Sequence, residues 1–387
     1  MALTKLNTLS LADDAITSAK IADNAIVTAA IADDAVTSAK TTVTSSNPNL
    51  LVNGSMQVAQ KPTLSHSGTN SAYSEVDRWY NELRAVGTYT ANQSTSVVPE
   101  GFSHSIEVKC TSADTSLDAN SYGHLTYKLE GQDVQAFKKG TSNAIAFCVS
   151  FWVRSSKTGT YVVRLRDNTN ARYLSKTYTV SSANTWEYKT LVFPADTTGA
   201  ITNNTSSGLS LYFWYSAGSQ YTGGSAESAW GAAGADTLAP GQVNLSDTAN
   251  AAIYFTGVKL EAAAACTAYV IPSYTEELQR CQRYYWAIRG DDGPDYSNNY
   301  GFNLQWSSAR FSGWNPFFPV IYPQEMRAIP TFSQTGTWSA SNGGSLNCTG
   351  YRTLTQCCLG LTGTTHGSGT YQNMNSTDDR IQWDAEL

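Results

Sequence analysis

Apolar and polar residues alternate with a period of two in many short runs between residues 105 and 260. In one run, alternate positions are all apolar: Phe147, Val149, Phe151 and Val153. A period of two places successive side chains on opposite faces of a strand. Similar runs, separated by turn residues, predict strands over 105–110, 123–129, 144–154, 159–167, 177–180, 186–193, 209–215 and 252–260. With no long helical pattern between them, these strands predict a two-sheet antiparallel β-sandwich.

A different pattern occupies the first forty residues. Three ten-residue repeats (11–20, 21–30 and 31–40) each carry an Asp followed by Asp or Asn, three alanines, and two regularly spaced aliphatics: Leu11, Ile16, Ile21, Ile26, Ile31 and Val36. A period of ten matches neither the seven nor the eleven of common coiled coils. Because so few apolar groups cannot offset the entropy of ordering ten residues, we expect three copies of the chain to share these aliphatics along one axis. The alternatives are a disordered tail or a helix broken at each Asp pair.

One helix is expected after the repeats, over 273–286. Pro272 and Ser273 supply entry signals, and Glu276 completes a capping box. Leu278, Cys281 and Tyr285 fall on one face, which we interpret as a packing face. From residue 290 onward the pattern returns to short strands and predicts a small C-terminal β domain.

Several segments carry a family resemblance. The decads resemble the shaft repeats of tail-fibre proteins of tailed bacteriophages. The segment 50–61 resembles the opening strand of their head domains, and Asp77-Arg78-Trp79-Tyr80 also matches the family pattern. The segments 149–154 and 255–261 resemble core strands of carbohydrate-binding jelly rolls in phage fibres. The end of the helix, the Pro-x-x-Met-Arg-Ala-x-Pro run at 323–330, and residues 384–387 are similar to fibre junctions and tips.

The resemblance implies a four-part chain. Residues 1–46 would form the virion attachment and the trimeric shaft, 47–272 the sandwich head, 273–289 a linking helix, and 290–387 a β knob at the tip. It further implies a homotrimeric tail fibre that binds a host surface glycan or protein, with its N-terminus held by tail or adaptor proteins. A non-receptor virion fibre (collar or head decoration) and a polysaccharide depolymerase are the alternatives. Sandwiches of this kind often hold a structural calcium, but no ligand set is visible.

Composition narrows the classes of partner. The net charge is −6 and no run of Lys or Arg occurs, which excludes the usual footprint of a nucleic-acid-binding protein. Neither a signal peptide nor a long apolar segment is visible, so we expect synthesis in the host cytoplasm, no membrane insertion, and a final place in the virion. The seven cysteines form no C-x-x-C pair, which argues against zinc. We expect reduced, buried thiols, with a disulfide in the head as the alternative.

We expect no enzyme activity and no cofactor. Glycoside hydrolysis needs two neighbouring carboxylates, whereas the acid pairs here (such as Asp13-Asp14 and Asp291-Asp292) lie in turn-like segments. The four histidines show neither metal-ligand nor triad spacing. Asp77 and Arg78 are interpreted as a structural corner, because no nucleophile or second acid stands beside them.

Aromatic side chains are the candidate glycan contacts, since sugar C–H groups pack on Tyr and Trp rings. The candidates are Trp214, Tyr221 and Trp230 in the head, and Trp306, Trp314, Tyr322 and Trp338 in the tip. Tyr221 and Trp230 lie in a Gly/Ala/Ser-rich segment, 216–240, whose length is unusual for a structureless loop. The alternative for Trp230 is that it packs inward and holds this loop in place.

Overall fold

The computed structural model describes residues 48–232, 234–289, 300–306, 317–336, 338–340, 345–348, 352–362, 370–374 and 380–387. All of them belong to one compact unit, Asn47–Leu387. The decad repeats, with Leu11, Ile16, Ile21, Ile26, Ile31 and Val36, lie outside the described residues, and so does Trp314. The trimeric shaft therefore stays a prediction.

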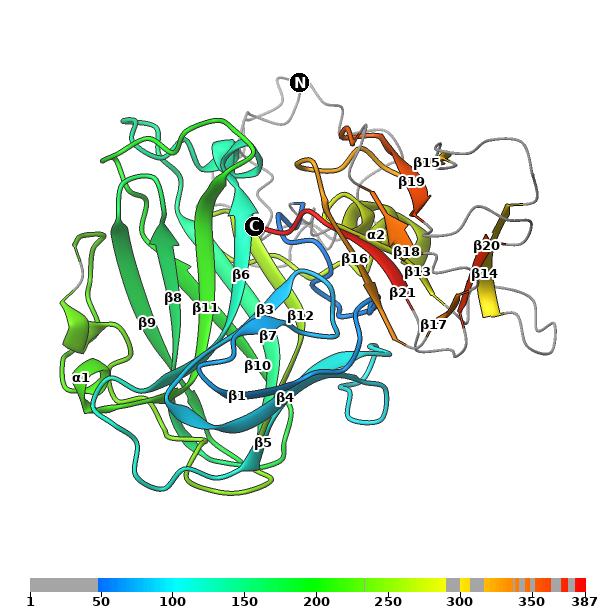
Figure 1. The fold of residues 1–387 in the computed structure, drawn as a ribbon. Coiled ribbons are helices and arrows are strands. Elements are labelled where there is room, and N and C mark those ends of the chain that lie inside the picture. The colour runs from blue at the N-terminus through cyan, green and yellow to red at the C-terminus, as the bar shows by residue number, and fades with distance from the viewer. Residues whose placement is uncertain are drawn as a thin grey trace, which may run out of the picture. The chain divides into compact units, whose positions relative to one another are not determined.

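Two six-stranded antiparallel sheets form the sandwich (Figure 1). Sheet A has the order β1 (Ser65–Gly68), β4 (Val86–Ser94), β5 (Ser105–Ser112), β12 (Ala252–Ala262), β7 (Phe147–Ser155) and β10 (Glu187–Phe193). Sheet B has the order β2 (Ala72–Tyr73), β3 (Trp79–Arg84), β6 (Tyr122–Glu130), β11 (Ser207–Ala217), β8 (Gly159–Asp167) and β9 (Arg172–Val180). The prediction of a mainly β, antiparallel sandwich is confirmed.

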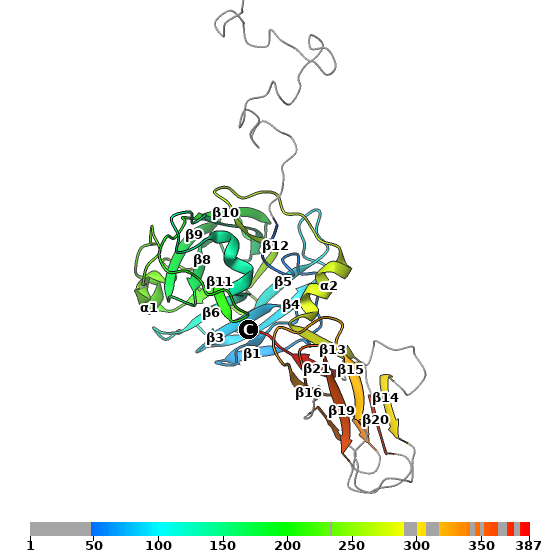
Figure 2. The ribbon, with the colours of Figure 1, turned by 90° about the horizontal axis from the view of Figure 1, so that it is seen from above.

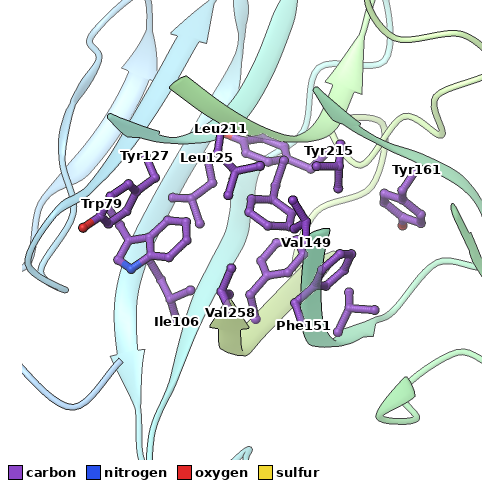
Figure 3. Close-up of a cluster of buried hydrophobic side chains, with 14 of the residues drawn as sticks. Trp79, Ile106, Leu125, Tyr127, Val149, Phe151, Tyr161, Leu211, Tyr215 and Val258 are labelled. Carbon is purple, nitrogen blue, oxygen red and sulfur yellow. The ribbon is translucent and has the colours of Figure 1, made fainter. Parts of the chain in front are cut away.

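The hydrophobic core lies between the two sheets (Figure 3). Rings from both sheets meet there: the centroids of Phe151 and Phe213 are 5.0 Å apart, and those of Phe213 and Phe255 are 4.8 Å apart. At one end of sheet B, Trp79 packs edge-on against Tyr127 at 5.1 Å. Because side chains alternate along a strand, the residues between these core positions on sheet B point away from sheet A.

The segment 50–61 forms the expected Asn-Gly turn but not the strand that was expected to follow it. Asn53 and Met56 both adopt left-handed backbone conformations (φ 59° and 60°), and the Met56 N–H donates to the Asn53 carbonyl at 3.2 Å. The Asn53 side-chain amide donates to the carbonyls of Val58 and Asp77. Asparagine tolerates this backbone region better than most residues, so the Asn-Gly pair forms a tight turn, and these side-chain hydrogen bonds hold the residues after it outside any sheet.

Helix α2 (Tyr274–Gln282) begins where expected but ends earlier. The Glu276 N–H donates to the Ser273 Oγ at 3.3 Å, which caps the first turn. Cys281, with Leu278 beside it, packs against Val52 and Val58, so this face is a packing face. Tyr285 was expected on the same helix but begins strand β13 (Tyr285–Arg289), where pairing with a distant strand replaces helical hydrogen bonds.

The C-terminal region contains three three-stranded antiparallel sheets (Figure 2). Their orders are β13, β21 (Arg380–Asp384), β16 (Thr331–Thr335); β14 (Tyr300–Trp306), β20 (Thr370–Met374), β17 (Trp338–Ala340); and β15 (Phe317–Ile321), β19 (Gln356–Thr362), β18 (Ser345–Asn347). Trp383 on β21 is fully buried and stacks on Trp286 at 4.6 Å. This cluster is a second small core, separate from that of the sandwich.

The expectation that the cysteines are all reduced is wrong for one pair. Cys148 on β7 and Cys266, just after β12, form a disulfide whose Cα atoms lie 5.3 Å apart. The two strands are neighbours in sheet A, which brings the thiols together across 118 positions of sequence. Cys110, Cys281, Cys348 and Cys357 are free and buried, and Cys358 is free and partly exposed.

Candidate functional site

The outward face of sheet B carries three rows of polar and aromatic side chains. One row crosses three paired strands: Glu82 on β3 lies opposite His124 on β6, which lies opposite Trp214 on β11. In the next row Tyr212 on β11 pairs with Arg164 on β8. In the third, Arg166 on β8 pairs with Tyr173 on β9. Rows two residues apart on neighbouring strands share one face of a sheet, so these side chains form a continuous surface.

This surface is the base of a cleft of about 380 Å³. The volume falls near the lower end of the range for small-molecule sites, roughly 300–1,000 Å³. One wall comes from the segment after β11, which includes α1 (Ser219–Thr222) and η5 (Ala235–Thr237). We call the whole the sheet B cleft, lined by Glu82, Tyr122, His124, Arg164, Arg166, Tyr173, Tyr212, Trp214, Tyr221, Ala235 and Leu238.

Arg164 lines the sheet B cleft from strand β8. Its guanidinium carbon is 4.2 Å from the ring centroid of Tyr212 and 5.2 Å from that of Trp214. Its residue surface is 6% exposed, and burial lowers the pKa of its guanidinium, because desolvation disfavours the charged form. Among the described residues, no carboxylate forms an ion pair with it, and its Nε has no hydrogen-bond partner. The aromatic rings thus hold a charged group in place without neutralising it.

His124 is neutral near pH 7. Burial lowers its pKa from 6.5 to about 4, with Arg164 acting in the same direction and Glu82 against it. Its Nδ1 lies 2.9 Å from the Thr126 Oγ1, and its ring stacks on that of Tyr122 at 5.0 Å. The imidazole therefore contributes a hydrogen-bonding group and a flat surface to the cleft, and no charge.

Glu82 stands at the opposite side of the cleft from the two arginines. It accepts a hydrogen bond from the Tyr122 hydroxyl at 3.3 Å, and one of its oxygens is 4.0 Å from His124 Nδ1. Its side chain is 32% exposed, so its free oxygen positions are open to a ligand hydroxyl. The cleft consequently has a negative side on β3 and a positive side on β8.

The structure places the predicted aromatic contacts in several different environments. Trp214 and Tyr221 both line the sheet B cleft. Trp230 packs inward: its Nε1 donates to the Pro194 carbonyl at 2.8 Å and its ring lies 5.1 Å from that of Phe147, so it holds the loop, as the alternative interpretation had it. Tyr322 is 4% exposed, within the second core.

Two further candidates are placed only by their strands. Trp306 ends β14 and Trp338 begins β17, and both strands pair with β20. Neither residue is among the described residues that line the sheet B cleft.

Sequence reasoning did not single out most of the cleft. Tyr122, His124, Arg164, Arg166, Tyr173, Tyr212 and Glu82 were not among the candidates. A signal was present in three pairs at i and i+2: Tyr122/His124, Arg164/Arg166 and Tyr212/Trp214. They alternate with core positions of predicted strands, with Tyr122 just before the strand predicted over 123–129. Such pairs mark the outward face of each strand, but they do not reveal which strands are neighbours.

One group of three possible metal ligands occurs among the described residues: Cys148, Glu261 and Cys266. The two cysteines are bonded to each other, and the Glu261 carboxylate lies 3.2 Å from Lys259 Nζ and accepts hydrogen bonds from Thr267. These groups are engaged with one another, so we interpret the cluster as a cross-link. No helix in the described part of the chain is long and apolar enough to cross a membrane.

Comparison with known proteins gives structural likenesses only. No family model matches the chain, and no curated protein matches it. The enzymatically active domain of tailspike protein 4 from bacteriophage CBA120 is 12% identical over 55% of this chain and 21% of its own, with a TM-score of 0.30. The module TmCBM61, in complex with β-1,4-galactotriose, is 8% identical over 56% and 99%, with a TM-score of 0.28.

A third likeness is the C-terminal family 22 carbohydrate-binding module of Clostridium thermocellum Xyn10B, 13% identical over 50% of this chain and 89% of its own, with a TM-score of 0.28. This chain thus spans about a fifth of the length of the tailspike structure and nearly all of the two modules. At these identities and TM-scores the likenesses carry no functional inference, and any function has to follow from the chemistry of the cleft.

Proposed function

We propose that this chain is a homotrimeric structural subunit of a bacteriophage tail fibre, and that it promotes host adsorption by binding a saccharide in the sheet B cleft. The cleft is the observation that carries the binding part of the proposal. It joins aromatic rings to a few charged and polar groups held at fixed positions, which is the usual composition of a small-molecule site.

The partly exposed rings and charges fit a sugar. Tyr122 and Tyr173 are half-buried, so part of each ring can pack against sugar C–H groups. Glu82 on one side can accept hydrogen bonds from hydroxyls, and Arg166 on the other can donate them. A volume of about 380 Å³ suits one or a few sugar units.

The fibre part of the proposal depends on the sequence. The decads are too poor in apolar groups to fold within one chain, which favours a trimeric shaft at 1–46. In this arrangement the N-terminus binds tail or adaptor proteins of the virion, and three heads act together. Three weak sites on one particle bind a surface far more tightly than one site does.

Binding is favoured over catalysis by the carboxylates of the cleft. Among the described residues that line it, Glu82 is the sole carboxylate, whereas glycoside hydrolysis generally uses two. A depolymerase would release reducing ends from host polysaccharide. A purely structural virion fibre would bind no host glycan.

The test is a binding assay with immobilised host-surface glycans and the full-length protein. Tyr122→Ala and Tyr173→Ala should each weaken binding about fivefold or more, because each removes a ring that packs on the sugar. Tyr188→Ala is the control, since Tyr188 is 40% exposed on strand β10 of sheet A. Absence of glycan binding, or equal binding by all three variants, would overturn the proposal.

A further inference from the structure

Arg164 is a buried charge that no carboxylate in the described part of the chain neutralises. No described residue forms a salt bridge with Arg164. Other buried charges in the same part of the chain are paired, such as Arg78 with Glu386 and Lys139 with Asp167. Leaving a buried guanidinium without an anion costs free energy. Because the Arg164 guanidinium lines the cleft, an anionic ligand bound there can supply the missing charge.

Arg166 extends the same positive region. It lies two residues along β8, on the same face, with its guanidinium carbon 5.3 Å from the ring centroid of Tyr173, and its Nε also lacks a hydrogen-bond partner in the described structure. Two guanidinium groups on one strand therefore line the cleft, and the Nε donor of each has no partner in the described structure. A guanidinium presents its donors as a planar fork that matches the oxygens of an anionic group.

Glu82, the sole carboxylate among the described residues that line the cleft, is too distant to cancel the charges of Arg164 and Arg166. Glu82 lies on β3, separated from β8 by β6 and β11, which corresponds to about 14 Å at the usual spacing of strands. His124, between them, is neutral near pH 7. The cleft thus has the negative charge of Glu82 at one side and the positive charges of Arg164 and Arg166 at the other. This separation fixes the direction in which an asymmetric ligand can lie.

We propose that the sheet B cleft selects an acidic saccharide, whose anionic group binds Arg164 and Arg166 while its hydroxyls face Glu82. This inference rests on the proposed function, because it names the class of sugar for the same site. The anionic group can be a carboxylate, as in uronic or sialic acids, or a sulfate ester. Both share the chemistry of an oxyanion at a guanidinium fork.

The experiment compares matched oligosaccharides on the full-length protein: neutral ones, and the same backbones carrying a carboxylate or a sulfate. We expect the acidic members to bind at least tenfold more tightly than the neutral ones, with an advantage that shrinks as salt is raised. The carboxylate and sulfate arms identify the source of the charge. Equal or tighter binding of neutral sugars overturns this inference and leaves the proposed function standing. Absence of binding to every member overturns both.

Two variants locate the selectivity. Arg164→Gln and Arg166→Gln should each abolish most of the acidic preference while retaining the weaker binding of neutral sugars. Arg166 is partly exposed, so its replacement tests the idea even if Arg164→Gln fails to fold. Arg154→Gln is the matched control, because Arg154 also stacks on a tyrosine, Tyr254, at 5.4 Å but lies on β7 of sheet A. If both variants still bind acidic oligosaccharides more tightly than neutral ones, Arg164 and Arg166 are not the groups that select the acidic sugar.

Discussion

Lys61 Nζ and the Glu386 carboxylate form an ion pair at 2.9 Å although 325 positions of sequence separate them. Arg78, whose guanidinium lies 3.4 Å from the ring centroid of Tyr284, pairs with the same carboxylate. Burial opposes ionisation of Glu386, but Arg78 and Lys61 hold the pKa of that carboxyl below its usual value. Residues just after β21 are thereby bound to the start of the sandwich through charges that are almost fully buried.

Replacing Glu386 with Gln should destabilise the fold by about 3–5 kcal/mol, because it leaves the buried Arg78 without its anion and Lys61 with Asp77 alone. The measurement is the midpoint of urea unfolding followed by tryptophan fluorescence. Asp247→Asn is the control: Asp247 pairs with Lys157 but its side chain is 41% exposed, and such a pair contributes about 1 kcal/mol or less. Similar losses in the two variants would contradict this account.

Stability should fall in mild acid because of His124. Its pKa is about 4 in the folded protein, against an ordinary value of 6.5 for histidine, so the unfolded chain binds the proton more readily. The contribution is complete above pH 6.5 and is lost as the pH falls toward 4, with a total on the order of 3 kcal/mol. His124→Gln should flatten unfolding free energies measured across this window. His104→Gln, at a less buried site, should keep the slope, and an unchanged slope in His124→Gln would count against the assignment.

The disulfide should contribute measurably to the sandwich. Cys148 and Cys266 close a loop with a sequence separation of 118, for which chain entropy suggests about 5 kcal/mol. The double variant Cys148→Ala/Cys266→Ala should unfold at a lower temperature than the oxidised protein. Dithiothreitol should lower the unfolding temperature of the unaltered protein and leave the variant unchanged. If dithiothreitol leaves the unfolding temperature of the unaltered protein unchanged, the disulfide does not stabilise the fold.

The decads should determine the oligomeric state. Replacing Ile16, Ile26 and Val36 with Asp puts charges at the proposed trimer axis, so we expect light scattering to show monomers where the unaltered protein gives trimers. The control replaces Ser18, Thr28 and Ser38, at polar positions of the same repeats, and should stay trimeric. A monomeric unaltered protein at micromolar concentration would refute the shaft.

The sequence alone determined the strands and their two faces. Alternation with a period of two predicted most strands of the sandwich, and the same alternation separated core residues such as Phe151 from residues of the opposite face such as Trp152. Ser273 and Glu276 likewise marked the start of helix α2. These features follow from local backbone geometry, which neighbouring residues in sequence control.

Only the tertiary structure decided which outward residues meet. Tyr212 and Arg164 lie on one surface because β11 pairs with β8, and Glu82 joins it because β3 pairs with β6. Pairing between strands far apart in sequence depends on how two whole sheets bury their apolar faces, which no local pattern reveals. The same reason explains Cys148 with Cys266 and Lys61 with Glu386: each pair is brought together by packing between segments more than a hundred residues apart.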